Sequence, residues 1–130
     1  GLDLERQQDI PSAYGTMSDV ISGFAELMES YPNIFLRTKY HETQFSYDDN
    51  LLVTAYNTNT HLLSLDDVAF SKTGFTDQSG GSLVVAVAYT PDEHYLIGVL
   101  GSSFQGRFTD VEYIIEQLHQ WRMEHQGVIQ

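Results

Sequence analysis

Cysteine is absent from this chain of 130 residues, so it can form no disulfide, offers no thiol nucleophile and has no cysteine metal site. Basic residues are scarce, because six Lys and Arg stand against 18 Asp and Glu, and the formal net charge is −12. Such a chain has no basic patch to neutralise phosphates, which argues against nucleic acid and against docking on an anionic membrane. The acidic balance fits a solvated, self-repelling surface, salt adaptation or a cationic partner.

Long apolar runs are also missing: none approaches the roughly 20 residues that a membrane-spanning helix needs, and no signal peptide is visible. The chain begins with Gly1 rather than Met, so we expect it to be a processed or cut part of a longer gene product. Its length fits one domain with one modest core, and we see no repeat or internal boundary within 1–130.

The first half of the chain predicts one helix and one hairpin. After a polar lead-in, Ser12 is a candidate N-cap, and Pro32 predicts that the helix ends near Ser30. Apolar residues recur every three or four positions between these limits, at Met17, Val20, Ile21, Phe24, Ala25 and Met28. Two runs with β character follow, and a loop with a short helical turn is expected after them. The two runs are Thr43 to Tyr47 and Leu51 to Tyr56, the turn between them is Asp48 to Asn50, and the loop is Asn57 to Leu65.

The second half predicts three strands and a last helix. The strands are Val68 to Thr73, Leu83 to Tyr89 and Tyr95 to Leu100, with a polar glycine-rich loop expected over Gly74 to Ser82. Connections this short require antiparallel pairing. Thr109 is a candidate cap for the last helix, whose apolar face would carry Val111, Ile114, Ile115, Leu118 and Trp121. We therefore expect an α/β protein of the α+β type, an antiparallel sheet flanked by helices.

The segment with the clearest chemistry is Ser71 to Thr76, which reads S-K-T-G-F-T at the end of an expected strand. A strand edge presents backbone N–H groups, and Gly74 lets a ligand approach the backbone closely. Lys72 adds a positive charge and Thr73 a hydroxyl donor. These groups suit a substrate with a terminal carboxylate and a carbonyl group to be polarised.

This segment and its surroundings resemble the serine-type D-alanyl-D-alanine carboxypeptidases, the low-molecular-mass penicillin-binding proteins, whose superfamily pairs K-T-G with S-x-x-K and S-D-N. The resemblance is most specific from Asn57 to Asp110 and softer before that. It includes Asn57-Thr58-Asn59, Gly80-Gly81 with Leu83-Val84, the run Tyr95 to Gly101, and Arg107-Phe108 followed by Asp110. It implies that 1–130 is the C-terminal part of a β-lactamase/transpeptidase-like catalytic domain.

The resemblance also implies roles for individual residues. Lys72 would stand beside the active serine, and the backbone N–H of Phe75 would supply half of the oxyanion hole. Thr73, with Gly74 and Thr76 on the same strand, would bind the substrate and its terminal carboxylate. Arg107 would hold the same carboxylate, since a guanidinium suits bidentate carboxylate recognition. The alternative for Arg107 is a salt bridge to a nearby acid, such as Asp110 or Glu112.

The chain departs from the family chiefly by what is missing. No Ser has a Lys three residues later, and no Ser-x-Asn occurs, so the nucleophile that an acyl-enzyme mechanism requires is absent. Phe70 and Thr16 also stand where the family usually has Gly and Asp. We expect the missing N-terminal part to lie in the uncut gene product or on another chain, and this chain alone to be inactive.

Other candidates for chemistry are weaker. The five histidines are His41, His61, His94, His119 and His125, and their spacing matches no metal motif. Asp48-Asp49 and Asp66-Asp67 are more typical of solvated turns than of a calcium site. We therefore expect no metal and no cofactor.

The resemblance implies a partner set and a location. The expected partners are peptidoglycan stem peptides ending in D-Ala-D-Ala, β-lactams, and the N-terminal part of the same enzyme or a second copy of the chain. The expected location is extracytoplasmic, in the cell envelope or secreted. The alternative function is a non-catalytic module of the same fold that binds peptidoglycan peptides or another protein.

Overall fold

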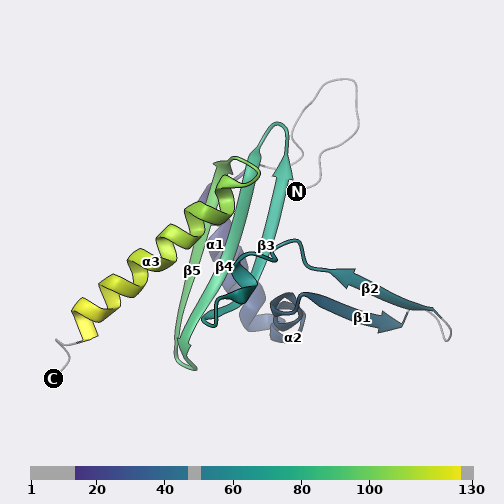
Figure 1. Cartoon of the computed structure of the whole chain (residues 1–130), viewed down its shortest axis with the longest axis horizontal. Helices are drawn as coiled ribbons and strands as arrows, with labels where there is room; N and C mark the ends of the chain where they lie inside the picture. Colours follow the sequence, from purple (N-terminus) through teal and green to yellow (C-terminus); the bar gives the residue numbers. More distant parts are fainter. Residues whose placement is uncertain (1–13, 47–50, 127–130) are drawn as a thin grey trace.

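The computed structural model describes residues 14–46 and 51–126 and has α+β architecture with two antiparallel sheets, as the sequence predicts (Figure 1). None of the helices in these ranges is long and apolar enough to span a membrane. The helices are α1 Met17–Ser30, α2 Pro32–Leu36 and α3 Gly106–Gln126, with 3-10 turns η1 Arg37–Lys39 and η2 Leu62–Ser64. The strands are β1 Glu42–Ser46, β2 Leu52–Tyr56, β3 Val68–Thr76, β4 Gly80–Thr90 and β5 Glu93–Ser102.

The main sheet has the strand order β3-β4-β5, and β1 and β2 form a separate hairpin that extends away from it (Figure 1). Both pairings in the main sheet are antiparallel, which confirms the expectation from the short connections. The predicted hairpin is confirmed in its strands, because Thr43 pairs with Ala55 and Phe45 with Val53. Its predicted turn at Asp48 to Asn50, together with Tyr47, lies outside the described residues.

One face of the main sheet packs against α3. Alternate residues of β4 point to this face and meet the apolar side of the helix, because side chains along a strand alternate between faces. The buried cluster contains Leu62, Val68, Leu83, Val85, Val87, Ile97, Phe108, Val111 and Ile115. The helix is only partly covered, since Ile114 and Trp121, which the sequence assigned to its apolar face, are exposed.

The opposite face of the sheet packs against α1 and α2. Met17 of α1 lies so close to Gly98 of β5 that a Cβ there would be 2.2 Å from the Met17 sulfur. A chain of aromatic contacts runs from Phe24 through Phe35 to Phe70, with ring centroids 5.7 and 5.5 Å apart. The sheet is therefore the middle of three layers, with helices on both sides.

The first helix begins later than the sequence suggested. Its N-cap is Thr16, which forms a capping box with Asp19, and the candidate cap Ser12 lies outside the described residues. The backbone and side-chain hydrogen bonds from Thr16 hold the pKa of the Asp19 carboxyl below its usual value. The predicted end at Ser30 is confirmed, and Pro32 starts the short helix α2, which was not predicted.

Two predictions in the second half are wrong, one of a loop and one of a helix cap. The expected loop over 74–82 is mostly strand, since β3 continues through Thr76 and β4 begins at Gly80. Register pairs from Lys72↔Val84 to Thr76↔Gly80 continue the ladder, so Gly74 and Phe75 lie within a strand and not after one. Thr109 does not cap α3, which begins at Gly106; its hydroxyl donates to the Gly106 carbonyl oxygen at 3.0 Å.

Candidate functional site

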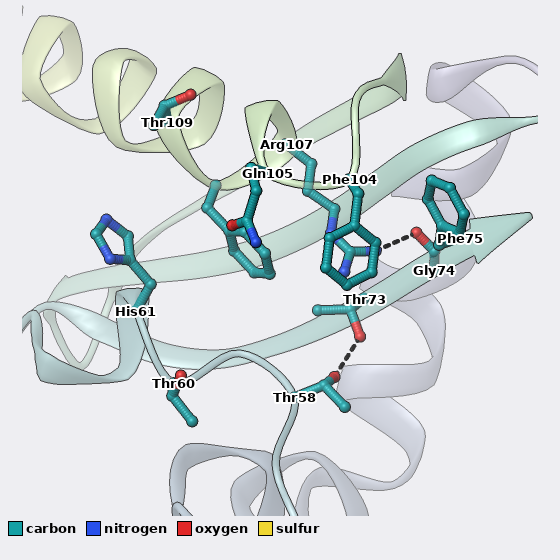
Figure 2. Close-up of a pocket in the computed structure, with 11 residues that line it drawn as sticks. Thr58, Thr60, His61, Thr73, Gly74, Phe75, Phe104, Gln105, Arg107 and Thr109 are labelled. Carbon is teal, nitrogen blue, oxygen red and sulfur yellow. Dashed lines mark hydrogen bonds between the residues drawn. The ribbon is translucent and has the colours of Figure 1, made fainter.

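A pocket of about 630 Å³ lies between β3 and the first turn of α3 (Figure 2). Strand β3 forms one wall, the loop before η2 forms another, and the β5–α3 connection with the start of α3 forms the third. The lining residues are Thr58, Thr60, His61, Thr73, Gly74, Phe75, Phe104, Gln105, Arg107, Phe108 and Thr109. The pocket therefore combines hydroxyl groups, aromatic rings and one permanent positive charge.

Arg107 joins the helix to the strand inside this pocket. Its Nη1 donates a hydrogen bond of 2.6 Å to the carbonyl oxygen of Gly74, which is drawn as a dashed line in Figure 2. The residue is only 4% exposed, and its Nε has no hydrogen-bond partner among the residues that the structure describes. The structure therefore brings Arg107 to the K-T-G strand, 33 residues away in sequence.

Three aromatic rings surround the Arg107 guanidinium. Its central carbon lies 4.6 Å from the ring centre of Phe104, 4.8 Å from that of Phe108 and 6.0 Å from that of Phe75. Cation–π contacts of this kind stabilise a guanidinium, but they do not neutralise its charge. A buried charge without a counter-ion is costly, and an anionic ligand would compensate it.

The two acids offered as salt-bridge partners for Arg107 are engaged elsewhere. Asp110 accepts a hydrogen bond of 2.6 Å from the Ser102 hydroxyl, and Glu112 pairs with His61 at 3.1 Å. Among residues 14–46 and 51–126, no carboxylate forms an ion pair with Arg107. The geometry thus favours the ligand-binding interpretation of Arg107 over a structural salt bridge.

Thr73 faces the pocket, and its hydroxyl lies 2.6 Å from that of Thr58 (Figure 2). The segment that carries Thr58 is fixed from both sides. The Asn57 amide donates to the Thr38 carbonyl at 2.6 Å, and the buried Asn59 amide donates to the Ser71 hydroxyl at 2.8 Å. The resemblance drew attention to this Asn-Thr-Asn segment, and the contacts give it a positional function beside β3.

The remaining predicted site residues are distributed differently. Gly74 and Phe75 line the pocket. Lys72 is exposed and does not line it, and its Nζ donates to the Thr73 carbonyl oxygen. Thr76 is also outside the lining, because its hydroxyl lies 2.6 Å from that of Ser79 in the β3–β4 turn. The structure thus groups Thr73, Gly74, Phe75 and Arg107 but leaves Lys72 and Thr76 apart from them.

Several pocket residues were not predicted as site residues. Phe104 and Phe108 hold the guanidinium, and His61 reaches the pocket from the loop before η2. Phe104 and Phe108 lie within three positions of Arg107, which is their only sequence signal, and His61 has none. In the described part of the chain no group of three or more His, Asp or Glu side chains could hold a metal ion.

Comparison with known proteins adds no assignment. No family model matches the sequence, and no curated protein matches it.

Proposed function

We propose that this chain is the C-terminal part of a serine-type D-alanyl-D-alanine carboxypeptidase with a β-lactamase/transpeptidase-like fold. In this proposal the missing N-terminal part supplies the serine, and this chain binds the peptidoglycan stem peptide that ends in D-Ala-D-Ala. The observation that carries it is the contact of 2.6 Å between Arg107 Nη1 and the Gly74 carbonyl oxygen, in a pocket that Thr73 also lines.

In the proposed chemistry this chain binds the substrate, and the missing N-terminal part carries out the nucleophilic attack. The Arg107 guanidinium and the Thr73 hydroxyl bind the terminal carboxylate, which places the preceding peptide carbonyl against β3. The backbone N–H of Phe75 then polarises that carbonyl as half of an oxyanion hole. The serine of the missing part attacks it, D-alanine leaves, and water releases the acyl group. Lys72 lies on the neighbouring position of β3, where the serine would approach, and β-lactams would acylate the same serine.

The enzyme would act outside the cytoplasm, where its peptidoglycan substrate is. Its strand β3 is an edge strand in the described structure, because it pairs only with β4. An edge strand can receive an extended peptide, and that supports a peptide as the ligand.

The binding half of the proposal can be tested on the 130-residue chain itself. Titration of ¹⁵N-labelled protein with N-acetyl-D-Ala-D-Ala should shift the amide signals of Thr73 to Phe75 and the Arg107 Nε–H signal. The C-terminal amide of the same peptide should bind at least about tenfold more weakly, because it lacks the charge.

Thr73→Val removes only the hydroxyl and should weaken binding of the acid by about five- to tenfold. The matched control is Thr54→Val on β2, which does not line the pocket. Equal binding of acid and amide to the unchanged protein would remove the basis of the proposal.

The second candidate is a non-catalytic module that binds peptidoglycan peptides or another protein. It is favoured by the missing Ser-x-x-Lys and by a pocket that this chain forms without any other part. The reading frame separates the two. A Ser-x-x-Lys encoded upstream of Gly1, with covalent labelling of that longer protein by fluorescent penicillin, supports the enzyme, and a start codon just before Gly1 supports the module.

A further inference from the structure

Phe104 is a half-exposed aromatic residue whose ring packs against the buried guanidinium of Arg107. It lies in the connection between β5 and α3, is 52% exposed, and covers the Arg107 guanidinium at 4.6 Å (Figure 2). Phe108 contacts the guanidinium at 4.8 Å and is buried. A ligand that reaches the guanidinium from the pocket therefore has to meet the Phe104 ring first.

Hydrogen bonds tie the backbone on both sides of Phe104 to the first turn of α3. The Gly106 N–H donates to the Ser103 hydroxyl at 2.8 Å, and the Arg107 N–H donates to the Ser103 carbonyl at 3.3 Å. Phe108 N–H donates to the Gln105 carbonyl at 3.1 Å. These bonds also occupy the first N–H donors of α3, which leaves the guanidinium as the anion-binding group at this helix end.

Phe75 extends the aromatic surface next to Phe104. The two rings meet edge to face, with centroids 5.2 Å apart and planes at 83°, and Phe75 is 44% exposed. Apart from Phe108, the rest of the pocket lining is mainly polar and includes the side chains of Thr58, Thr60, Thr73 and Gln105. A ligand here would therefore meet hydrogen-bonding groups on one side and aromatic carbon on the other, with the charge between them.

The geometry points to Phe104 as a specificity-determining residue of this pocket. In the free protein its ring covers the Arg107 guanidinium. When a carboxylate displaces the ring, Phe104 and Phe75 together form an apolar wall that selects ligands with an apolar side chain next to the carboxylate. The ligand class is thus a peptide whose last residue carries both groups. This inference rests on the proposed function in taking the anionic group to be a carboxylate.

The test compares three peptides that differ only in their last residue: N-acetyl-D-Ala-Gly, N-acetyl-D-Ala-D-Ala and N-acetyl-D-Ala-D-Leu. With the unchanged protein, the D-Ala peptide should bind about fourfold more tightly than the Gly peptide, the gain expected for one buried methyl group, and the D-Leu peptide more tightly again. In Phe104→Ala the preference for the D-Ala peptide over the Gly peptide should fall below about twofold. The Gly peptide should bind Phe104→Ala as tightly as the unchanged protein or more so, because the guanidinium is no longer covered.

Two further variants and one signal control the result. Phe104→Leu keeps an apolar wall and should retain most of the preference. Phe45→Ala removes a ring of similar exposure, 46% against 52%, from β1 outside the pocket, and should change nothing. The Arg107 Nε–H signal should move downfield in Phe104→Ala without ligand, since the shielding ring above it is gone.

The outcomes separate this inference from the proposed function. If acids bind better than amides but Phe104→Ala keeps the full preference for D-Ala over Gly, the inference is wrong and the carboxylate site stands. If acid and amide bind alike while Phe104→Ala loses the preference, the apolar wall stands and the carboxypeptidase assignment falls. No binding of any peptide to the unchanged protein or to Phe104→Ala overturns both.

Discussion

Gly81 lies where the sheet closely approaches the connection between β5 and α3. It is the second residue of β4, opposite Phe75, and a Cβ atom there would lie 2.3 Å from the backbone carbonyl oxygen of Ser103. That oxygen belongs to the connection that carries Phe104, and it accepts the hydrogen bond from the Arg107 N–H. The absence of a side chain at Gly81 therefore lets the loop lie close enough to position both residues.

We predict that Gly81→Ala destabilises the protein by about 1–3 kcal/mol, the usual cost of forcing extra volume into a packed site. Backbone must move to relieve the contact, because no flexible side chain is involved. Urea unfolding followed by circular dichroism measures the change. The matched control is Gly23→Ala in the interior of α1, where a Cβ would meet nothing within 4 Å.

The control substitution should change the free energy of unfolding in the opposite direction. Gly23→Ala should stabilise the protein by about 0.5–1 kcal/mol, because alanine has the higher helix propensity. Similar destabilisation by both substitutions would mean that the close contact at Gly81 does not limit the packing.

At this scale the sequence predicted some of the pocket and missed the rest. Thr73, Gly74 and Arg107 were expected together from a resemblance, and the structure places them together. Phe104 could not be predicted, because an aromatic ring covering a cation depends on how β5 and α3 meet in space. Lys72 does not line the pocket, because side chains at adjacent strand positions point to opposite faces, and its expected place beside the serine of the missing part stays a prediction.

At the scale of elements, an ionic contact fastens the far end of α3 to the sheet. Arg122 of α3 donates two hydrogen bonds to the Glu93 carboxylate of β5, at 2.8 and 2.7 Å. The Tyr95 hydroxyl donates to the same carboxylate at 2.9 Å, and the Arg122 guanidinium lies 3.6 Å from the ring centre of Tyr89. The helix is thus held at its start by Arg107 and near its end by Arg122.

The ionic contact makes part of the stability depend on pH. Hydrogen bonds from Arg122, and then from Tyr95, hold the pKa of the Glu93 carboxyl below its ordinary value of 4.5. A carboxyl with a lowered folded pKa stabilises the protein above its unfolded pKa and loses that contribution as the pH falls through the folded pKa. Glu93→Gln should therefore be less stable than the unchanged protein at about pH 7, and the difference should shrink below pH 4.5.

Urea midpoints measured across this pH range give the difference directly. The capping hydrogen bonds also lower the pKa of Asp19. Protonation of Asp19 in acid therefore destabilises the unchanged protein and Glu93→Gln by the same amount. Asp19→Asn is the matched control. The pH-dependent change in the free energy of unfolding that it causes should add to the change caused by Glu93→Gln, since the two sites lie in separate contacts. A gap that stays constant down to about pH 2 would contradict this account.

Element prediction succeeded where periodicity is strong and failed where glycine and polar residues occur inside strands. The apolar spacing of α1 and the valines of β4 were sufficient to predict both elements. Residues 74–82 were expected as a loop, yet the structure has only Asp77 to Ser79 in the turn. Pairing with a long neighbouring strand overrides local preference there, because β3 stays in register with β4 through Thr76↔Gly80 and so extends the ladder.

At the scale of the whole molecule, strong negative charge opposes a partly uncovered apolar surface. The net charge is −12, while among residues 14–46 and 51–126 strand β5 pairs only with β4, and large apolar side chains of several elements remain exposed. These include Leu27 and Tyr31 near the end of α1, Phe45 and Leu52 of the hairpin, and Leu100 of β5. An edge strand with such neighbours tends to pair with another chain, and like charge resists it.

The salt concentration should therefore determine whether this chain is a monomer or self-associates. Charge repulsion acts over about 10 Å at 0.1 M salt but only about 3 Å at 1 M, so raising the salt concentration should promote association through the β5 edge. Light scattering after size exclusion should give the monomer mass of 14.7 kDa in dilute salt and a larger mass near 1 M.

Leu100→Lys places a charge on the edge strand and should prevent the increase in mass. Met123→Lys on α3 changes the net charge equally but leaves the edge intact, so it should associate as before. A monomer with a cooperative melt at every salt concentration would instead mean that the chain is complete in itself, without the N-terminal part or second copy that we propose as its partner.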